Sequence, residues 1–116
     1  MENKRIAFDL DNTLCKGHPY KKSKPIQEMI DILNQLHADG CYIIVYTGRG
    51  MSKGRTRGQA VNMYWQLTYK QLKDWKVLFD ELIFGKPDFD LLIDDKVVNS
   101  RQITKKEDVY HTIKHL

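Results

Sequence analysis

Residues 6–14 have the sequence IAFDLDNTL, and this stretch decides how the rest of the chain is interpreted. A short apolar run ends in Asp9 and Asp11, two acids one residue apart. A buried strand of a parallel sheet delivers acids to its C-terminal end in this way, although a strand followed by an ordinary polar turn is the alternative. Side chains alternate along a strand, so both acids would share a face if the chain stayed extended past Leu10. Two carboxylates at such a short distance repel each other unless a cation or a proton lies between them. Their proximity therefore favours an active site.

The length and composition limit the architecture. With 116 residues we expect one domain spanning 1–116, with no room for a separate cap domain. No apolar run approaches the roughly 20 residues that cross a bilayer, and the first residues show no signal-peptide pattern. We therefore expect a cytoplasmic protein without a membrane partner, whose Cys15 and Cys41 are reduced thiols.

The hydrophobic pattern predicts strands at residues 4–9, 41–46, 81–84 and 89–93, with a minor fifth strand at Val97 and Val98. Apolar residues at steps of three and four predict a helix that begins at Pro25 and stops at Gly40. A long helix is expected after a mobile loop at 51–58, and Thr104 is expected to cap a last helix. Alternating strands and helices predict an α/β fold, a three-layer α/β/α sandwich with a mainly parallel, Rossmann-like sheet.

Polar side chains follow four of the predicted strands. Because ligands bind in the crevice at the carboxyl ends of parallel strands, we expect one site to contain Asp9, Asp11, Thr47, Lys86, Asp94 and Asp95. Acids from two strand ends make a hard oxygen site of the kind that Mg²⁺ uses. A hydroxyl, a lysine and the amides of a glycine turn suit the oxygens of a transferring phosphoryl group, and an aspartate can itself attack phosphorus. The pattern therefore indicates phosphoryl transfer.

These motifs resemble a known family. The segments Asp9-Leu10-Asp11-Asn12-Thr13, Thr47-Gly48, Lys86-Pro87 and Asp94-Asp95 are similar, in order and spacing, to the four motifs of the haloacid dehalogenase superfamily of phosphatases. The resemblance extends from residue 6 to about residue 99. The amino-acid sequences of residues 46–51 and 84–96 also resemble those of small phosphatases of bacterial capsule or surface-polysaccharide synthesis.

The resemblance implies a role for each motif residue. It implies that Asp9 is the nucleophile, and that Asp11 is the acid and base and also binds Mg²⁺ through its backbone carbonyl. Thr47 would bind the phosphoryl oxygens, and Lys86 would hold Asp9. Asp94 would bind Mg²⁺ together with Asp9, and Asp95 would be a further ligand through water or the neighbour that orients Asp94. Leu10 and Gly48 would contribute backbone N–H groups.

The intervals between motifs are too short for the cap domain of larger members, so substrate selection would come from loops or from a partner subunit in a homo-oligomer. The net charge is +4, and the basic residues cluster in two stretches without acids, 12–27 and 48–73. Both stretches follow strand ends, so we expect an electropositive rim that attracts an anionic substrate. Its members are Lys21, Lys22, Lys24, Arg49, Lys53, Arg55 and Arg57.

We expect a small phosphorylated sugar, polyol or amino alcohol as substrate, and a nucleotide or polynucleotide end is the alternative. A nucleic-acid-binding module would use the basic loops, Trp65 and Trp75, but it leaves the acids unexplained. A phospho-accepting receiver domain is an alternative of another class. In a receiver the threonine and lysine follow the phosphorylated aspartate on the third strand, whereas here the last acids follow Lys86.

Overall fold

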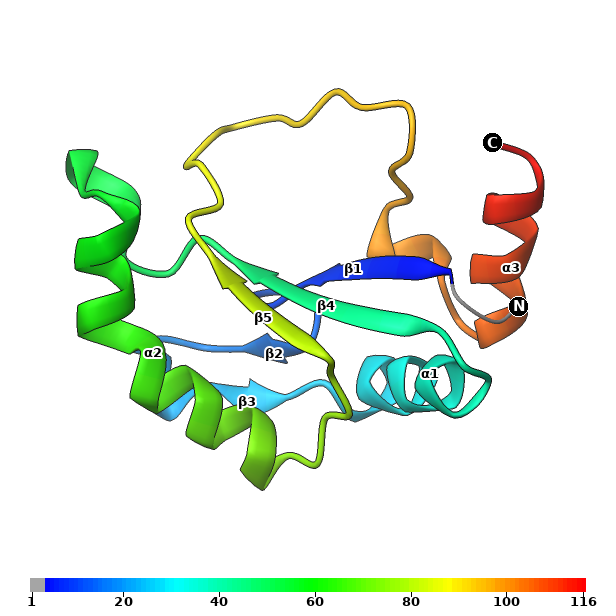
Figure 1. The fold of residues 1–116 in the computed structure, drawn as a ribbon, viewed down its shortest axis with the longest axis horizontal. Helices are drawn as coiled ribbons and strands as arrows, with labels where there is room; N and C mark the ends of the chain where they lie inside the picture. Colours follow the sequence, from blue (N-terminus) through cyan, green and yellow to red (C-terminus); the bar gives the residue numbers. More distant parts are fainter. Residues whose placement is uncertain (1–3) are drawn as a thin grey trace.

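The computed structural model describes residues 4–116, apart from the side chain of Lys53. Its centre is a parallel sheet of three strands in the order β1-β4-β5 (Figure 1). The strands are β1 (Arg5–Asp9), β4 (Tyr42–Thr47) and β5 (Glu81–Phe84). The predicted α/β class with a mainly parallel sheet is thus confirmed.

Strand β4 alternates between a buried and a half-buried face. Ile43, Val45 and Thr47 are fully buried, whereas the intervening residues are half-buried. The register pairs Phe8 with Val45 and Thr47 with Phe84, so the buried face continues across all three strands. It also aligns the carboxyl ends of the strands, so that Asp9, Thr47 and the residues after Phe84 meet at one edge of the sheet.

Helix α1 (Gln27–Ala38) follows the predicted spacing, and its buried residues Ile30, Leu33 and Leu36 join the same hydrophobic cluster as the sheet. It begins two residues later than predicted. Pro25 belongs instead to β3 (Lys24–Pro25), which pairs with β2 (Cys15–Lys16) in a short antiparallel ribbon. That pairing takes Pro25 out of the helix.

Helix α2 (Arg57–Asp74) begins at a capping box. The Gln59 N–H donates to Thr56 Oγ1 (3.2 Å) and the Thr56 N–H donates to Gln59 Oε1 (2.8 Å). The helix packs against β5, where Trp65 lies 5.7 Å from the Phe84 ring. No helix in the described part of the chain is long and apolar enough to pass through a membrane. Short 3₁₀ turns lie at η1 (Tyr20–Lys22), η2 (Ser52–Gly54) and η3 (Ser100–Gln102).

The predicted strand at residues 89–93 is wrong. Residues 85–99 form a long loop that arches away from the sheet, yellow to orange in Figure 1. Leu91 and Ile93 are 76% and 89% exposed, and Val97 and Val98 do not form a strand either. An apolar run becomes a strand only when it pairs with a neighbour, and hydrophobic pattern alone does not guarantee that pairing. Strand β1 is consequently an edge strand among the described residues.

Helix α3 (Lys106–Lys114) packs beside α1 and is tied to it through one carboxylate. Asp39, just after α1, accepts hydrogen bonds from Tyr110 Oη (2.6 Å) and from Lys106 Nζ (2.9 Å). The bond from Tyr110 is the main cause, and the one from Lys106 the second, of a pKa for Asp39 below its ordinary value. The expected cap Thr104 lies one residue before the observed N-cap, Lys105, and both donate to Asp108.

This arrangement predicts that Asp39→Asn lowers the melting temperature at neutral pH. A carboxyl whose pKa is depressed by folding stabilises the protein above its ordinary pKa, and that contribution is lost as the pH falls below about 4. The difference in melting temperature between wild type and Asp39→Asn, measured by circular dichroism, should therefore shrink between pH 7 and pH 3. Glu28→Gln on the exposed side of α1 serves as the control. A difference that stayed constant over this range would contradict the assignment.

Candidate active site

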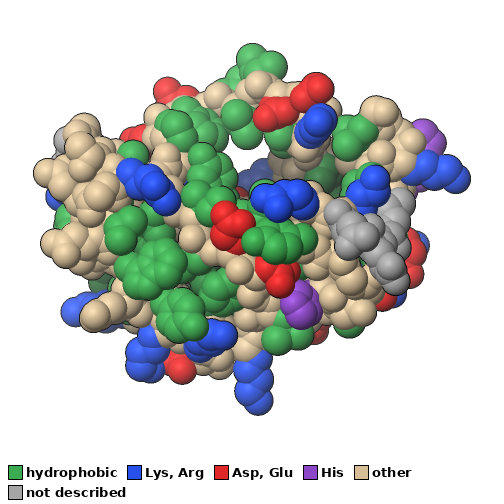
Figure 2. Space-filling model, in the orientation of Figure 1, with side chains coloured by type: hydrophobic (Ala, Val, Ile, Leu, Met, Phe, Trp, Pro, Cys, Tyr) green, Lys and Arg blue, Asp and Glu red, His purple; other side chains and the backbone are tan. Residues whose placement is uncertain are grey.

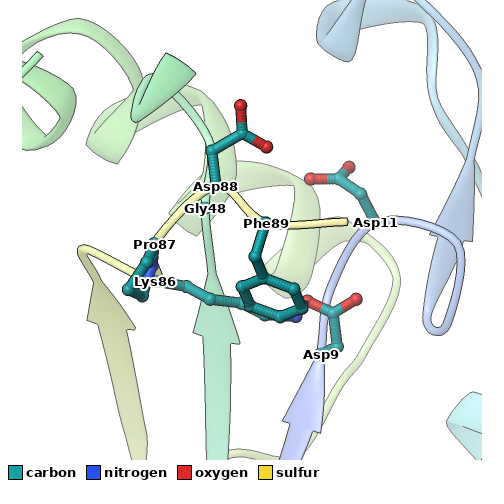
Figure 3. Close-up of a pocket in the computed structure, with 7 residues that line it drawn as sticks. All are labelled: Asp9, Asp11, Gly48, Lys86, Pro87, Asp88 and Phe89. Atoms are coloured by element: carbon teal, nitrogen blue, oxygen red, sulfur yellow. Dashed lines mark ion pairs between the residues drawn. The ribbon is translucent and has the colours of Figure 1, made fainter. Parts of the chain in front are cut away.

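An open, partly polar cavity of about 190 Å³ lies at the carboxyl ends of the three strands (Figure 3). Four of the predicted site residues meet here. They are Asp9 and Asp11 at the end of β1, Gly48 after β4 and Lys86 after β5. The lining residues are Asp9, Asp11, Gly48, Lys86, Pro87, Asp88 and Phe89.

Asp9 and Lys86 form an ion pair across the cavity floor. Lys86 Nζ lies 2.9 Å from Asp9 Oδ1, and the two side chains are 21% and 37% exposed. The ammonium group also lies 5.3 Å from the centre of the Phe89 ring. Figure 3 shows the lysine stem running beside this ring toward Asp9. A carboxylate held by a partly buried cation is kept in one orientation at the end of β1.

Gly48 allows β4 and β5 to approach each other at the cavity. A Cβ atom at this position would lie 3.1 Å from the backbone carbonyl oxygen of Lys86. Because that oxygen belongs to the main chain, it could give way only if the end of β5 moved. The absence of a side chain at residue 48 therefore helps to position Lys86.

The prediction that Arg49 belongs to an exposed rim is wrong, because its side chain is fully buried. Its Nη2 lies 3.1 Å from Asp11 Oδ1, and its Nε lies 3.3 Å and 3.2 Å from Oδ1 and Oδ2. The next residue, Gly50, has a positive φ of 78° and packs closely against α2. A Cβ atom on Gly50 would lie 2.9 Å from the Tyr64 ring. Asp11 is thus paired with a guanidinium, while Asp9 is paired with Lys86.

Two of the predicted phosphoryl-binding residues are engaged elsewhere. Thr47 is fully buried, and its Oγ1 accepts a hydrogen bond from the Arg49 N–H (3.0 Å). The Leu10 N–H donates to the Tyr46 carbonyl (3.2 Å). Neither residue lines the cavity. The structure places both at the strand ends, next to the site, with these donors and acceptors already in use.

Asp94 and Asp95 lie exposed on the loop 85–99, outside the cavity. Asp94 Oδ1 accepts a hydrogen bond from the Lys96 N–H (3.0 Å), which is the largest cause of its lowered pKa. Within residues 4–116, no group of three or more histidine, cysteine or acidic residues is placed to hold a metal. The four predicted Mg²⁺ ligands are therefore not assembled in this conformation.

A second, larger cavity of about 740 Å³ lies between the outer edge of β1, the loop and α3. Asp9 and Asp94 both contribute to its lining, together with apolar residues that include Leu92 and Val97. Figure 2 shows the opening beneath the arching loop. Asp94 thus borders the same space as Asp9 without meeting it.

The other members of the predicted rim surround neither cavity. Lys21, Lys22, Lys24 and Arg57 are exposed, and Arg55 is partly buried. Arg57 Nε donates to the Phe84 carbonyl (3.2 Å), which ties this arginine to the end of β5. The side chain of Lys53 lies outside the described part of the structure. The basic residues are therefore near the strand ends in sequence, but none of those described lines the site.

Sequence reasoning missed Asp88, which is one of the residues that line the cavity. Figure 3 shows it pointing away from Asp9. Its position two residues after Lys86 is the signal that the sequence offers.

Acids, a lysine and a glycine turn meet at the carboxyl ends of these parallel strands, where open α/β sheets bind their ligands, so the cavity is the candidate active site. The sequence profile described as "haloacid dehalogenase-like hydrolase" matches residues 6–70, more than half of the chain. The chain belongs to this family. The matched region includes Asp9, Asp11 and Thr47 and ends before Lys86.

A solved structure supports the same fold. The crystal structure of a structural-genomics target from Vibrio cholerae matches with a TM-score of 0.81, covering 97% of this chain and 99% of that chain at 24% identity. At this identity the likeness shows the fold alone. No curated protein matches significantly.

The close packing around Gly50 predicts a large loss of stability for Gly50→Ala. An alanine there would adopt a positive φ, at a cost of about 1 kcal/mol, and its Cβ would press on Ala60 and Tyr64, adding about 2 kcal/mol. Gly54→Ala is the matched control, because Gly54 also has a positive φ (71°) but its Cβ would meet nothing within 4 Å. Urea unfolding should give a clearly lower free energy of unfolding for Gly50→Ala. Equal losses would show that the contacts of Gly50 do not matter.

Proposed function

We propose that this protein is a Mg²⁺-dependent phosphomonoester hydrolase that works through an aspartyl-phosphate on Asp9. The observation that supports this most is the position of the Asp9 carboxylate, which lies in the cavity at the end of β1 with Lys86 2.9 Å away. The family assignment supports hydrolysis as the class of reaction. The phosphatase activity, the metal and the substrate are our inference.

In the first step an oxygen of Asp9 attacks phosphorus. The bond from phosphorus to the leaving oxygen breaks, and Asp11 donates a proton to that oxygen. In the second step a water oxygen attacks phosphorus, Asp11 accepts the proton of the water, and the bond from phosphorus to Asp9 breaks. Lys86 counters the negative charge that develops near Asp9. Two easier displacements then replace one difficult displacement.

The phosphoryl oxygens need donors around them. Gly48 lines the cavity and would offer its backbone N–H. The Leu10 N–H would join only by exchanging the hydrogen bond that it now donates to the Tyr46 carbonyl. Thr47 accepts from the Arg49 N–H, so its own hydroxyl hydrogen would remain to donate to a phosphoryl oxygen.

Carboxylate and carbonyl oxygens are the donors that Mg²⁺ prefers, so the acids of the site suit this metal in kind. Asp9 and the backbone carbonyl of Asp11 would hold it, with Asp94 and Asp95 from the loop completing the protein ligands. When bound, Mg²⁺ would neutralise the phosphate charge and orient it. Because Asp94 and Asp9 border one cavity, the loop 85–99 has only to close over that space to supply the third acid.

The substrate that we propose is a small phosphorylated sugar, polyol or amino alcohol, used in the synthesis of a surface-polysaccharide precursor. The cavity of about 190 Å³ is open on one side, so a substrate whose phosphoryl group lies at Asp9 could extend from it toward solvent. Exposed Lys21 and Arg57, together with Arg55, provide positive charge in the chain segments that follow the first two strand ends.

If Asp9 is the nucleophile, Asp9→Asn should lower kcat by roughly 10³-fold or more while leaving the fold intact. Turnover is measured with Mg²⁺ on a panel of sugar, polyol, amino-alcohol and nucleotide phosphates and a phosphorylated oligonucleotide. Asp74→Asn is the matched control, because Asp74 is an exposed carboxylate paired with Lys70 on α2. Substantial activity in folded Asp9→Asn would rule out the covalent route.

The proposed metal ligands predict that EDTA stops turnover and that Mg²⁺ restores it. Asp94→Asn should raise the Mg²⁺ concentration for half-maximal activity by about 10- to 100-fold, because a ligand from the loop is lost. Asp90→Asn, on the same loop, is the control and should behave like wild type. Indifference to chelation, or equal effects of the two loop variants, would count against this ligand set.

A further inference from the structure

Arg49 is a buried cation whose hydrogen-bonding groups are all occupied. Nε and Nη2 bind the Asp11 carboxylate, and Nη2 also lies 3.6 Å from Cys15 Sγ. Nη1 donates to Thr68 Oγ1 (3.0 Å) and to Gln71 Oε1 (2.6 Å) on α2. A guanidinium has five N–H groups, so each of them has a partner here. This arginine cannot rotate without leaving a buried donor unpaired.

The support for Arg49 comes from parts of the chain that do not form the cavity. The Tyr20 ring lies 4.7 Å from the guanidinium carbon, and the Gln71 Nε2 donates to the Tyr20 carbonyl (2.7 Å). Tyr20 packs in turn edge-on against Tyr64 of α2. The turn η1 and helix α2 therefore hold the guanidinium from the sides away from Asp11.

Asp11 lies between this support and the cavity. Its side chain is 30% exposed and lines the cavity, while the Arg49 side chain is fully buried. The guanidinium contacts both carboxylate oxygens and so restricts both the position and the plane of the carboxylate. Among the partners of Arg49 named here, Asp11 is the one that lines the cavity.

We propose that Arg49 is a positioning residue that orients the Asp11 carboxylate for its proton transfers, an inference that rests on the proposed phosphatase function. In the second step the water oxygen bonds to phosphorus, its proton passes to a carboxylate oxygen of Asp11, and the bond from phosphorus to Asp9 breaks. A carboxylate that is misplaced by about 1 Å loses much of its effect as a base. Arg49 touches neither Asp9 nor Lys86 in any contact described above. Formation of the Asp9–phosphorus bond therefore does not need Arg49 when the leaving group departs without a proton from Asp11.

The test separates the two steps with p-nitrophenyl phosphate, whose leaving group departs without a proton. Arg49→Lys and Arg49→Met should still release about one p-nitrophenolate per folded site in a rapid burst, followed by turnover slowed roughly 10²-fold. Phosphorylated Asp9 should accumulate in acid-quenched samples and be visible by intact mass. A lysine keeps the positive charge but lacks the planar set of N–H donors that holds both oxygens of Asp11. Turnover of Arg49→Lys should therefore be almost as slow as that of Arg49→Met. Arg101→Met is the matched control, since it removes an exposed arginine that lines neither cavity, and it should show wild-type kinetics.

A residue that only stabilises the fold would lower the burst and the turnover in proportion to the folded fraction, which melting curves measure. Wild-type turnover per folded Arg49 variant, or loss of the burst in folded protein, would overturn the proposal. Should neither Arg49 variant fold, Tyr20→Leu decides, because it uncovers the guanidinium without removing it. Turnover slowed several-fold with the burst intact supports the proposal, and unchanged kinetics overturn it. A wild-type protein that neither hydrolyses the ester nor becomes phosphorylated would instead refute the proposed phosphatase function itself.

Discussion

The pairing of β4 with strands on both sides is the constraint on which the site depends. Parallel pairing aligns the carboxyl ends of β1, β4 and β5, so residues from positions 9, 48 and 86 meet although they are far apart in the chain. The pairing is stabilised by burial of one continuous face, in which Ile43 and Val45 are fully covered. The chemistry therefore depends on an apolar face that never touches the cavity.

Two acids that start one residue apart are kept separate by different cations. Asp9 is paired with Lys86, which is partly exposed, and Asp11 with Arg49, which is fully buried. Like charges at this spacing would otherwise repel each other or share a proton. Giving each acid its own partner allows them to take different roles, because each carboxylate is oriented by a separate part of the fold.

The features that the sequence predicted correctly depend on residues close together in the chain, and those that it missed depend on residues far apart. Local patterns predicted the strands of the sheet, the positions of Asp9, Gly48 and Lys86, and the long helix α2. The burial of Arg49 could not be predicted locally, since it requires acceptors on Thr68 and Gln71, about twenty residues away on a helix face. An arginine in a glycine-rich basic stretch looks like a surface residue until those acceptors are known.

The failed strand at 89–93 has a related cause, and it shows which part of the site is adjustable. The apolar pattern of Leu91 and Ile93 is that of a strand, yet both side chains are exposed and β1 keeps an unpaired edge beside a cavity of about 740 Å³. Leu92 and Val97 of the same loop line this space and are 49% and 50% exposed, so closing the loop over it would bury them further. The same movement would carry Asp94 toward Asp9. Two sides of the cavity are thus built into the sheet, whereas the acid that we propose as the third contribution would come from a loop that gains burial on closing.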